Sequence, residues 1–170
     1  MRFLLLTSAL FLAACGAQNE WRGSESDLSA LDHYPKTPLQ SLTPGALCSD
    51  PESYRYPEQI AYCGRHVAFA LKAEVFHIYE QEYGSFVSSV GRSRFKIDHL
   101  IPLCMGGGNV RENLWPQFED IYGQTDPIES GLCDLMASGR LKQSEAIELI
   151  RKAKADPERA HETLDKLDRI

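Results

Sequence analysis

The chain lacks three features that would assign it to a specialised class of protein. No apolar run away from the N-terminus is long enough to cross a bilayer, which excludes a spanning segment there. No internal repeat is visible, and no Cys-x-x-Cys pair is present, so a structural zinc site is not expected. What remains is 170 residues of ordinary globular composition, enough for one domain with an appended segment.

Excess positive charge is also missing. The chain has 18 Lys and Arg residues against 24 Asp and Glu residues, a formal net charge of −6. Residues 1–14 contain Arg2 and no acidic residue, so their removal takes the charge from −6 to −7. Because phosphate binding rests largely on Lys and Arg, any nucleic-acid role requires a local basic patch.

Residues 1–15 have the layout of a secretory signal. Arg2 precedes an apolar run of about ten residues, which ends in small side chains. Residues 12–15, Leu-Ala-Ala-Cys, resemble the lipobox of bacterial lipoproteins, in which the signal is cut before the Cys and that Cys is acylated. The resemblance implies a signal peptide at 1–14 and a lipid on Cys15. An ordinary signal peptide with an incidental Cys is the alternative, since the run is too short for an anchor.

The residue after the Cys indicates a destination within the envelope. Gly16 stands where an Asp, in the Gram-negative lipoprotein family, favours the inner membrane. The resemblance therefore implies an outer-membrane anchor, and it leaves the periplasmic and surface faces both open.

The cysteine count agrees with export. Five Cys are present, and a lipidated Cys15 leaves an even number, which predicts two disulfides in an exported chain. Three pairings are possible. We favour Cys48–Cys63 with Cys104–Cys133, because short loops close most easily.

Composition and periodicity divide the rest of the chain. Residues 15–44 are polar and broken by Gly and Pro, which predicts a lipidated Cys followed by a flexible tether. An α+β domain is expected over residues 45–170, with a small hairpin packed among several helices. Ser144 is a candidate N-cap, and Pro157 suits the start of a helix. The expected elements are a helix over 56–83, β-forming segments at 86–90 and 94–101, a short strand near 113–115, and helices at 118–136, 144–155 and 157–167.

One stretch carries chemistry. Residues 98–115 read DHLIPLCMGGGNVRENLW, an Asp-His pair and a Pro followed by a glycine turn and Asn-Leu-Trp. This stretch resembles the ββα-metal hairpin of HNH-type endonucleases, and the joint pattern is much rarer than its parts. Similarity to exported bacterial HNH-like proteins extends from about residue 44 to about residue 141, more than half of the chain.

The resemblance implies a role for each motif residue. Asp98 would bind a divalent metal ion, for which its hard oxygen suits Mg²⁺ or Mn²⁺. His99 would be the general base on water, since its unperturbed pKa lies near neutrality. Asn113 would hydrogen-bond back across the loop and hold the base in place.

The sequence departs from the family at the third metal ligand. That residue would fall about nine positions after Asn113, at Tyr122, and a Tyr is a poor ligand there. Among the oxygens of residues 117–126 we select Asp120, a carboxylate that favours Mg²⁺ or Mn²⁺ over softer metals.

A short basic stretch precedes the motif. Arg92, Arg94 and Lys96 alternate, so an intact strand would put them on one face, where with Arg111 they are candidates for phosphate contacts. A solvated strand face is the alternative. Residues 151–170 mix both signs of charge, which is typical of a solvated helical surface.

Together these features predict a monomeric, membrane-tethered, metal-dependent nuclease that hydrolyses DNA, and RNA as a second substrate, outside the cytoplasm. The first alternative is a non-catalytic envelope lipoprotein that uses a degenerate HNH scaffold to bind protein or nucleic acid. The second is a disulfide-stapled structural lipoprotein in which the motif arose by chance.

Overall fold

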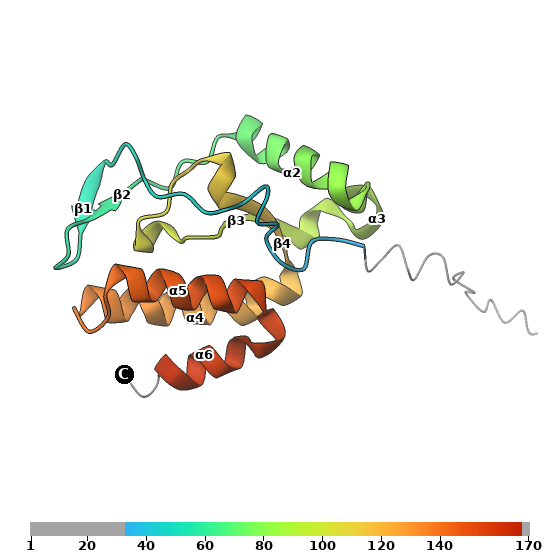
Figure 1. The fold of residues 1–170 in the computed structure, drawn as a ribbon. Helices are drawn as coiled ribbons and strands as arrows, with labels where there is room; N and C mark the ends of the chain where they lie inside the picture. The colour runs from blue at the N-terminus through green and yellow to red at the C-terminus, as the bar shows by residue number, and fades with distance from the viewer. Residues whose placement is uncertain (1–32, 168–170) are drawn as a thin grey trace, which may run out of the picture.

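The computed structural model describes residues 33–167, so the signal segment and Cys15 lie outside the described residues. Within this range the chain is a mixed α+β fold, as expected (Figure 1). The strands are β1 (Ser53–Arg55), β2 (Ile60–Tyr62), β3 (Phe95–His99) and β4 (Leu114–Phe118). The helices are α2 (Phe69–Tyr83), α3 (Phe86–Val90), α4 (Glu119–Ala137), α5 (Gln143–Ala155) and α6 (Ala160–Leu167).

The motif region forms a hairpin that leads directly into a helix. Strands β3 and β4 pair antiparallel, from Phe95 opposite Phe118 to His99 opposite Leu114. Helix α4 begins at Glu119, immediately after β4. The predicted order of strand, turn, strand and helix is therefore present, while a metal-binding role for it stays a prediction.

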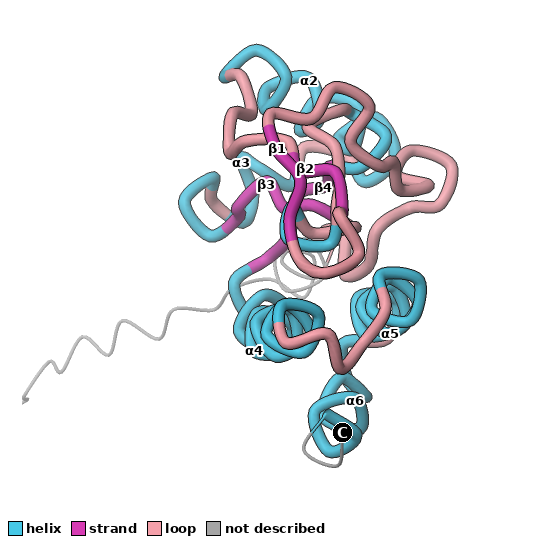
Figure 2. The backbone as a smooth tube through the Cα atoms, turned by 90° about the vertical axis from the view of Figure 1, so that its left-hand side faces the viewer, coloured by secondary structure: helices cyan, strands magenta, loops and turns pink. Residues whose placement is uncertain are grey.

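Helices cover this hairpin on two sides. Figures 1 and 2 show α4 and α5 side by side below the strands, with α6 beneath them and α2 above. Buried aromatic side chains join α2 and α3 to the hairpin, and a second apolar cluster joins α4, α5 and α6 to the loop after β3. Burial of such a side chain stabilises the fold by roughly 1.5–3 kcal/mol. The end of β3 is thus held between two packed layers.

Two predicted elements differ from the structure. The helix expected over 56–83 begins only at Phe69, because residues 53–62 form the β1–β2 hairpin. Tyr56 and Gln59 in its turn have positive φ angles of 63° and 55°, which a right-handed helix excludes. The segment Phe86–Val90 is a short helix rather than a strand, and its two terminal residues, one helical turn apart, are both buried.

The predicted tether is also too long. Tyr34, Leu39 and Leu42 pack against the aromatic cluster, so residues 34–43 belong to the domain. Buried Thr43 reinforces this contact by hydrogen bonding the hydroxyl of Tyr79 at 2.8 Å and donating to the carbonyl of Leu114 at 2.9 Å. The apolar residues of this segment are too few and irregular to give a periodic signal.

Both predicted disulfides are confirmed. Cys48 pairs with Cys63 and Cys104 with Cys133, at Cα–Cα distances of 5.7 and 5.9 Å. Such bonds persist in oxidising compartments, so they indicate a protein that works outside the cytoplasm. Between residues 33 and 167, no helix combines the length and the apolar character needed to cross a bilayer.

The C-terminal helices occur in the predicted order, but the N-cap of α5 differs from the prediction. Helix α5 begins at Gln143, so its N-cap is Lys142 and not Ser144. The N–H of Lys142 donates to the Glu145 carboxylate at 3.1 Å, which satisfies a backbone group at the helix start. Pro157 opens a short 3-10 turn before α6, as its fixed φ favours.

Candidate active site

A cleft of about 1000 Å³ opens beside the end of β3. Asp98 and His99 lie in its wall, as the motif predicts for a working site. Helix α4 contributes three carboxylates to the lining, those of Asp126, Glu129 and Asp134. Further lining residues come from β1, from β2 and from the segment that leads into α2. A concave site with several titratable groups is where a ligand or substrate is expected to bind.

Asn113 closes the loop between β3 and β4. Its side chain is completely buried, and its Oδ1 accepts a hydrogen bond from the Ile101 N–H at 2.9 Å. Its Nδ2 donates to the carbonyls of Ile101 and Gly108, at 2.9 and 3.0 Å. A Cβ on Gly107 would collide with the Ile101 carbonyl, so only Gly fits this turn. Asn113 therefore fixes the backbone that follows His99 and does not contact the imidazole through any of these bonds.

The imidazole of His99 is held by Asn109. Nε2 of His99 lies 2.9 Å from Oδ1 of Asn109, whose Nδ2 donates to the Gly64 carbonyl at 2.6 Å. Because a carbonyl only accepts, this network assigns Oδ1 to the side of His99. A neutral His99 then donates from Nε2 and keeps a free lone pair on Nδ1.

The protonation of His99 suits a base. Burial lowers its pKa below the ordinary value of 6.5, although the Asn109 hydrogen bond and the Asp98 charge act in the opposite direction. The imidazole is therefore neutral at neutral pH. A group that accepts a proton in a reaction must begin in this state.

A buried lysine fixes Asp98. The ammonium of Lys154, on α5, donates to Oδ2 of Asp98 and to the carbonyl of His99, both at 2.6 Å, and Oε2 of Glu129 lies 3.4 Å away. Burial disfavours the ionised Asp98 carboxyl, but Lys154 and Lys96 outweigh it and lower the pKa of Asp98. Burial of Lys154 is likewise outweighed by Asp98 and Glu129, which raise its pKa. Burial raises the pKa of Glu129.

A second lysine lies on the cleft side of Asp98. The ammonium of Lys96 contacts both Asp126 oxygens, at 2.7 and 2.8 Å, and lies 3.4 Å from Oδ1 of Asp98. It also lies 4.7 Å from the ring centroid of Tyr122, the residue at the family's third-ligand position. Asp98 and Asp126 thus share one cation, and Tyr122 contacts that cation through its ring.

The other proposed oxygens lie elsewhere. Asp120 is exposed and outside the cleft lining, and Glu119 forms a 2.6 Å ion pair with Arg94. Gln117 is buried and donates to Thr125 at 2.9 Å. The structure does not bring Asp120 to Asp98, because the first turn of α4 presents it to solvent.

The donor set limits how a metal ion would bind. Between residues 33 and 167, no group of three or more His, Cys, Asp or Glu side chains is placed to hold a metal ion. The Asp98–Asp126 pair remains, and its shared Lys96 ammonium shows that the two carboxylates favour a cation there. Mg²⁺ is commonly held by one or two carboxylates, water and substrate phosphate. The pair therefore fits an ion that is completed by its substrate.

The predicted basic patch is not assembled. Strand β3 begins only at Phe95, so Arg92 and Arg94 lie in a 3-10 turn where strand alternation does not apply. Arg92 donates to the Phe95 carbonyl at 2.8 Å, and Arg111 pairs with Glu112 at 2.8 Å. Of the four predicted contacts, only Lys96 lines the cleft.

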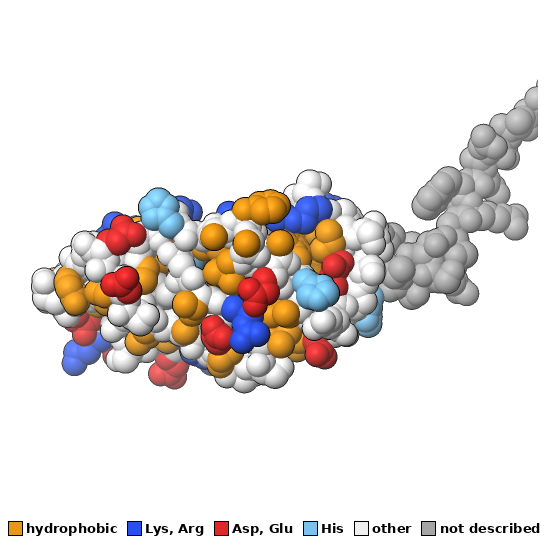
Figure 3. Space-filling model, turned by 90° about the horizontal axis from the view of Figure 1, so that it is seen from above, with side chains coloured by type: hydrophobic (Ala, Val, Ile, Leu, Met, Phe, Trp, Pro, Cys, Tyr) orange, Lys and Arg blue, Asp and Glu red, His pale blue; other side chains and the backbone are white. Residues whose placement is uncertain are grey.

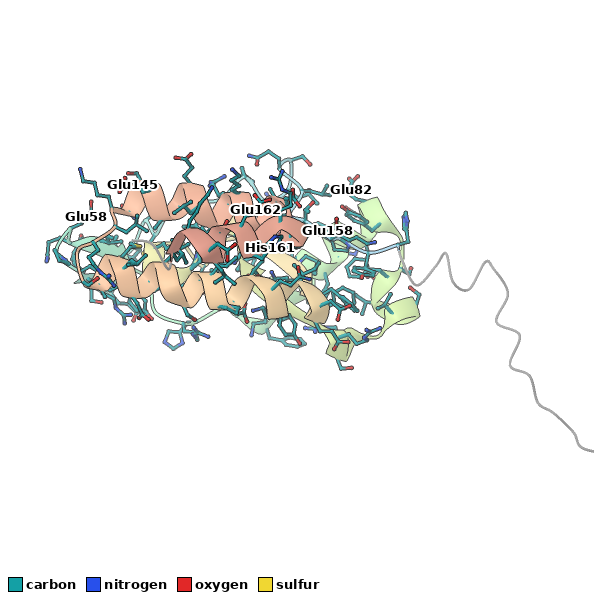
Figure 4. The ribbon with its side chains drawn as sticks, turned by 90° about the horizontal axis from the view of Figure 1, so that it is seen from below. Glu58, Glu82, Glu145, Glu158, His161 and Glu162 are labelled. Atoms are coloured by element: carbon teal, nitrogen blue, oxygen red, sulfur yellow. A yellow bond between two sulfur atoms is a disulfide. The ribbon has the colours of Figure 1, made fainter. Side chains whose placement is uncertain are left out.

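The face of the described residues that Figure 3 shows is not uniformly basic. Figure 3 shows Lys, Arg, Asp and Glu side chains interspersed on the face seen from above. Figure 4 shows α4, α5 and α6 from below, with acidic Glu158 and Glu162 near His161 and Glu145 at the end of the molecule where Glu58 lies. An anionic ligand is therefore expected to depend on the cleft itself.

The candidate site consists of cleft residues and of buried residues that hold them in place, some predicted from the sequence and some not. Asp98, His99 and Asn113 lie together at the end of the hairpin, while Asn109 and Lys154 were not singled out from the sequence. Comparisons with protein-family models, with curated proteins and with solved structures find no match for this chain. A functional assignment rests on the residues and contacts of the cleft.

Proposed function

We propose that the chain is a metal-dependent hydrolase that cleaves phosphodiester bonds of nucleic acid, DNA in the first place, with His99 as general base. The observation that carries the proposal is the contact between His99 Nε2 and Asn109, which leaves Nδ1 free. His99 borders the cleft beside the fixed carboxylate of Asp98, and the attacking water and the substrate would enter there. General base catalysis of this kind contributes about 10²- to 10⁴-fold to a rate.

In this proposal the surrounding residues orient and stabilise the base. Nδ1 of His99 takes a proton from the attacking water, and the negative charge of Asp98 stabilises the resulting imidazolium. Lys154 fixes Asp98 and the His99 carbonyl together, which limits the movement of both. Asn113 holds the backbone that follows, so the catalytic geometry does not depend on a mobile loop.

The carboxylate pair is the proposed metal site. Asp98 and Asp126 would hold Mg²⁺ or Mn²⁺, which when bound offsets charge on the phosphate and leaving oxygen. Lys96 would have to move aside, and its side chain is 34% exposed, on a flexible stem. Asp120 is a weaker choice because it is exposed and lies outside the cleft lining.

The proposed place of action is the bacterial envelope. Acylation of Cys15 would anchor the chain, with the outer membrane favoured. The two disulfides support action outside the cytoplasm. Such an anchor would separate a nuclease of low sequence specificity from the cell's own chromosome.

A non-catalytic binding protein is the second candidate. Each oxygen of Asp98 already faces a lysine ammonium, and Tyr122 occupies the third-ligand position. If these lysines replace the metal permanently, the scaffold would bind protein or nucleic acid without cleaving it. Calorimetry would then detect no binding of Mg²⁺ or Mn²⁺.

Plasmid nicking separates the two candidates. The full chain, purified in detergent with its disulfides intact, is expected to nick supercoiled DNA with Mg²⁺ or Mn²⁺ and to stop when EDTA is added. His99→Ala should abolish nicking, whereas His66→Ala, which alters an exposed His of the same cleft, should retain it. The absence of cleavage with every divalent metal would overturn the hydrolase proposal.

A further inference from the structure

Three cationic side chains line the cleft without a carboxylate partner. Among residues 33–167, Arg55, Arg65 and Lys72 form no ion pair with an acidic side chain. Arg94 and Arg111, in contrast, are both paired with glutamates outside the cleft. Unpaired cations that face a cleft are available to an anionic ligand, and phosphate is the anion that Arg and Lys commonly bind.

These cations belong to one stretch of the chain, residues 55–72, called here the Arg and Lys wall. Arg55 ends β1, Arg65 follows Cys63 by two residues, and Lys72 lies in the first turn of α2. The disulfide from Cys63 to Cys48 fixes the start of this segment. The hydrogen bond from Asn109 to the Gly64 carbonyl ties the same segment to the residue that holds His99. The wall is therefore positioned relative to the candidate base.

The lining residues of α4 differ in charge from the Arg and Lys wall. Helix α4 contributes Asp126, Glu129 and Asp134, and only Asp126 and Glu129 have lysine partners, Lys96 and Lys154. A strand of phosphates would be repelled by the α4 wall and attracted to the Arg and Lys wall. Cations on a single wall suit one chain of phosphates better than the two backbones of a duplex.

An exposed aromatic side chain stands beside this wall. Phe69, the first residue of α2, is 86% exposed, and Lys72 follows it by three residues, which places both on neighbouring parts of the helix surface. Ala68, immediately before it, lines the cleft. Tyr62 also lines the cleft, but the Arg55 guanidinium covers its ring at 3.2 Å from the centroid. Phe69 therefore offers an open aromatic ring next to the cleft.

We propose that Arg55, Arg65, Lys72 and Phe69 form a binding wall for single-stranded nucleic acid. The three cations contact successive phosphates, and a base stacks on Phe69, the combination by which single strands are commonly bound. This inference deepens the proposed function by naming its substrate class. Duplex binding typically uses about 6–10 phosphate contacts, and this wall supplies fewer.

Binding in EDTA tests the wall apart from cleavage. The probe is a fluorescent single-stranded oligonucleotide of about 12 nucleotides, titrated against the full chain by anisotropy at several salt concentrations. Three phosphate contacts predict a slope of log K against log salt of about −2, since each contributes about −0.7. Arg65→Gln and Lys72→Gln should each reduce the slope by about 0.7. Phe69→Ala should weaken binding at least about fivefold with the slope unchanged.

Matched variants and a duplex probe complete the test. Arg94→Gln and Arg111→Gln remove paired surface cations and should leave affinity and slope unchanged. Equal losses in these controls, or tighter binding of a duplex of the same sequence, would overturn the inference. Single-strand binding with the expected slope in a chain that never cleaves would support the wall and overturn the proposed hydrolase. Cleavage by the chain, with binding that none of the wall variants changes, would support the hydrolase proposal and overturn the wall.

Discussion

The ammonium of Lys154 lies 2.6 Å from Oδ2 of Asp98, across a sequence separation of 56 residues. This ammonium is shielded from water, because the Lys154 side chain is 0% exposed. It also donates to the carbonyl of His99 and to the carboxylate of Glu129. Helix α5 thereby fixes the position of Asp98 and His99 through this buried lysine. The candidate site depends on the C-terminal helices as well as on the hairpin.

Removal of this lysine should destabilise the whole fold. Lys154→Met leaves Asp98, 13% exposed, and Glu129 without their buried cation, and loss of one partner of a buried pair costs about 3–5 kcal/mol. Urea unfolding measures this loss. Lys96→Met, which removes a more exposed ion pair, should cost about 1 kcal/mol or less. Equal effects of the two substitutions would contradict the buried network.

The same network predicts a rescue. Asp98→Asn in the Lys154→Met background removes one of the unpaired charges, so the double variant should be more stable than Lys154→Met alone. An additive further loss of stability in the urea experiment would show that Asp98 and Lys154 do not interact.

The pH dependence of cleavage should report His99. Because its folded pKa is lowered below 6.5, the base form persists into mildly acidic solution, and the rate should fall only as pH drops below 6.5. Asn109→Ala removes a bond that raises this pKa, so the acidic limb should move further down while the rate decreases. Asn109→Asp should move the limb upward. Rate measurements across pH that show the same limb in all three proteins would contradict the contact.

The loop after β3 should reject any side chain at its tightest glycine. Gly107→Ala would place Cβ against the Ile101 carbonyl and 2.8 Å from Nδ2 of Asn113. The substitution should lower the melting temperature and the cleavage rate together. Gly123→Ala, in α4 with no atom within 4 Å of the added Cβ, should instead stabilise by about 0.5–1 kcal/mol. Calorimetry should therefore show a lower melting temperature for Gly107→Ala and a higher one for Gly123→Ala than for the unmodified chain.

Alkaline pH should loosen the segment before β1. Burial raises the pKa of Tyr79 to about 12, although hydrogen bonds with Thr43 and Leu39 lower it. Its stabilising contribution is complete below the ordinary pKa of 10 and is lost as pH rises toward 12. The stability advantage over Tyr79→Phe, about 1 kcal/mol at neutral pH, should therefore shrink across this window. Urea unfolding at several pH values measures the difference.

Local signals explain what the sequence could predict. The Asp98–His99 pair, the glycine run and Asn113 lie within one hairpin, so their proximity follows from the turn. The helix at 118–136 was predicted within one residue at each end because its pattern is long. The disulfide pairing could be predicted because short loops close most easily.

The residues that were missed depend on distant contacts. Lys154 belongs to a stretch that mixes both signs of charge and was predicted to be solvated, yet it is buried against Asp98 from another part of the chain. Asn109 directly follows the glycine run, where a polar residue is a signal for a positioning group. The β1–β2 hairpin escaped because Tyr56 and Gln59, not Gly, adopt positive φ.

Imidazole rescue tests the central claim that His99 is the base for phosphodiester hydrolysis. His99→Gly, with its fold checked by circular dichroism, should nick plasmid DNA about 10²- to 10⁴-fold more slowly than the unmodified chain. Added imidazole should restore part of that rate in His99→Gly and leave the unmodified chain unaffected. Nicking by His99→Gly at the unmodified rate, without added imidazole, would contradict the account.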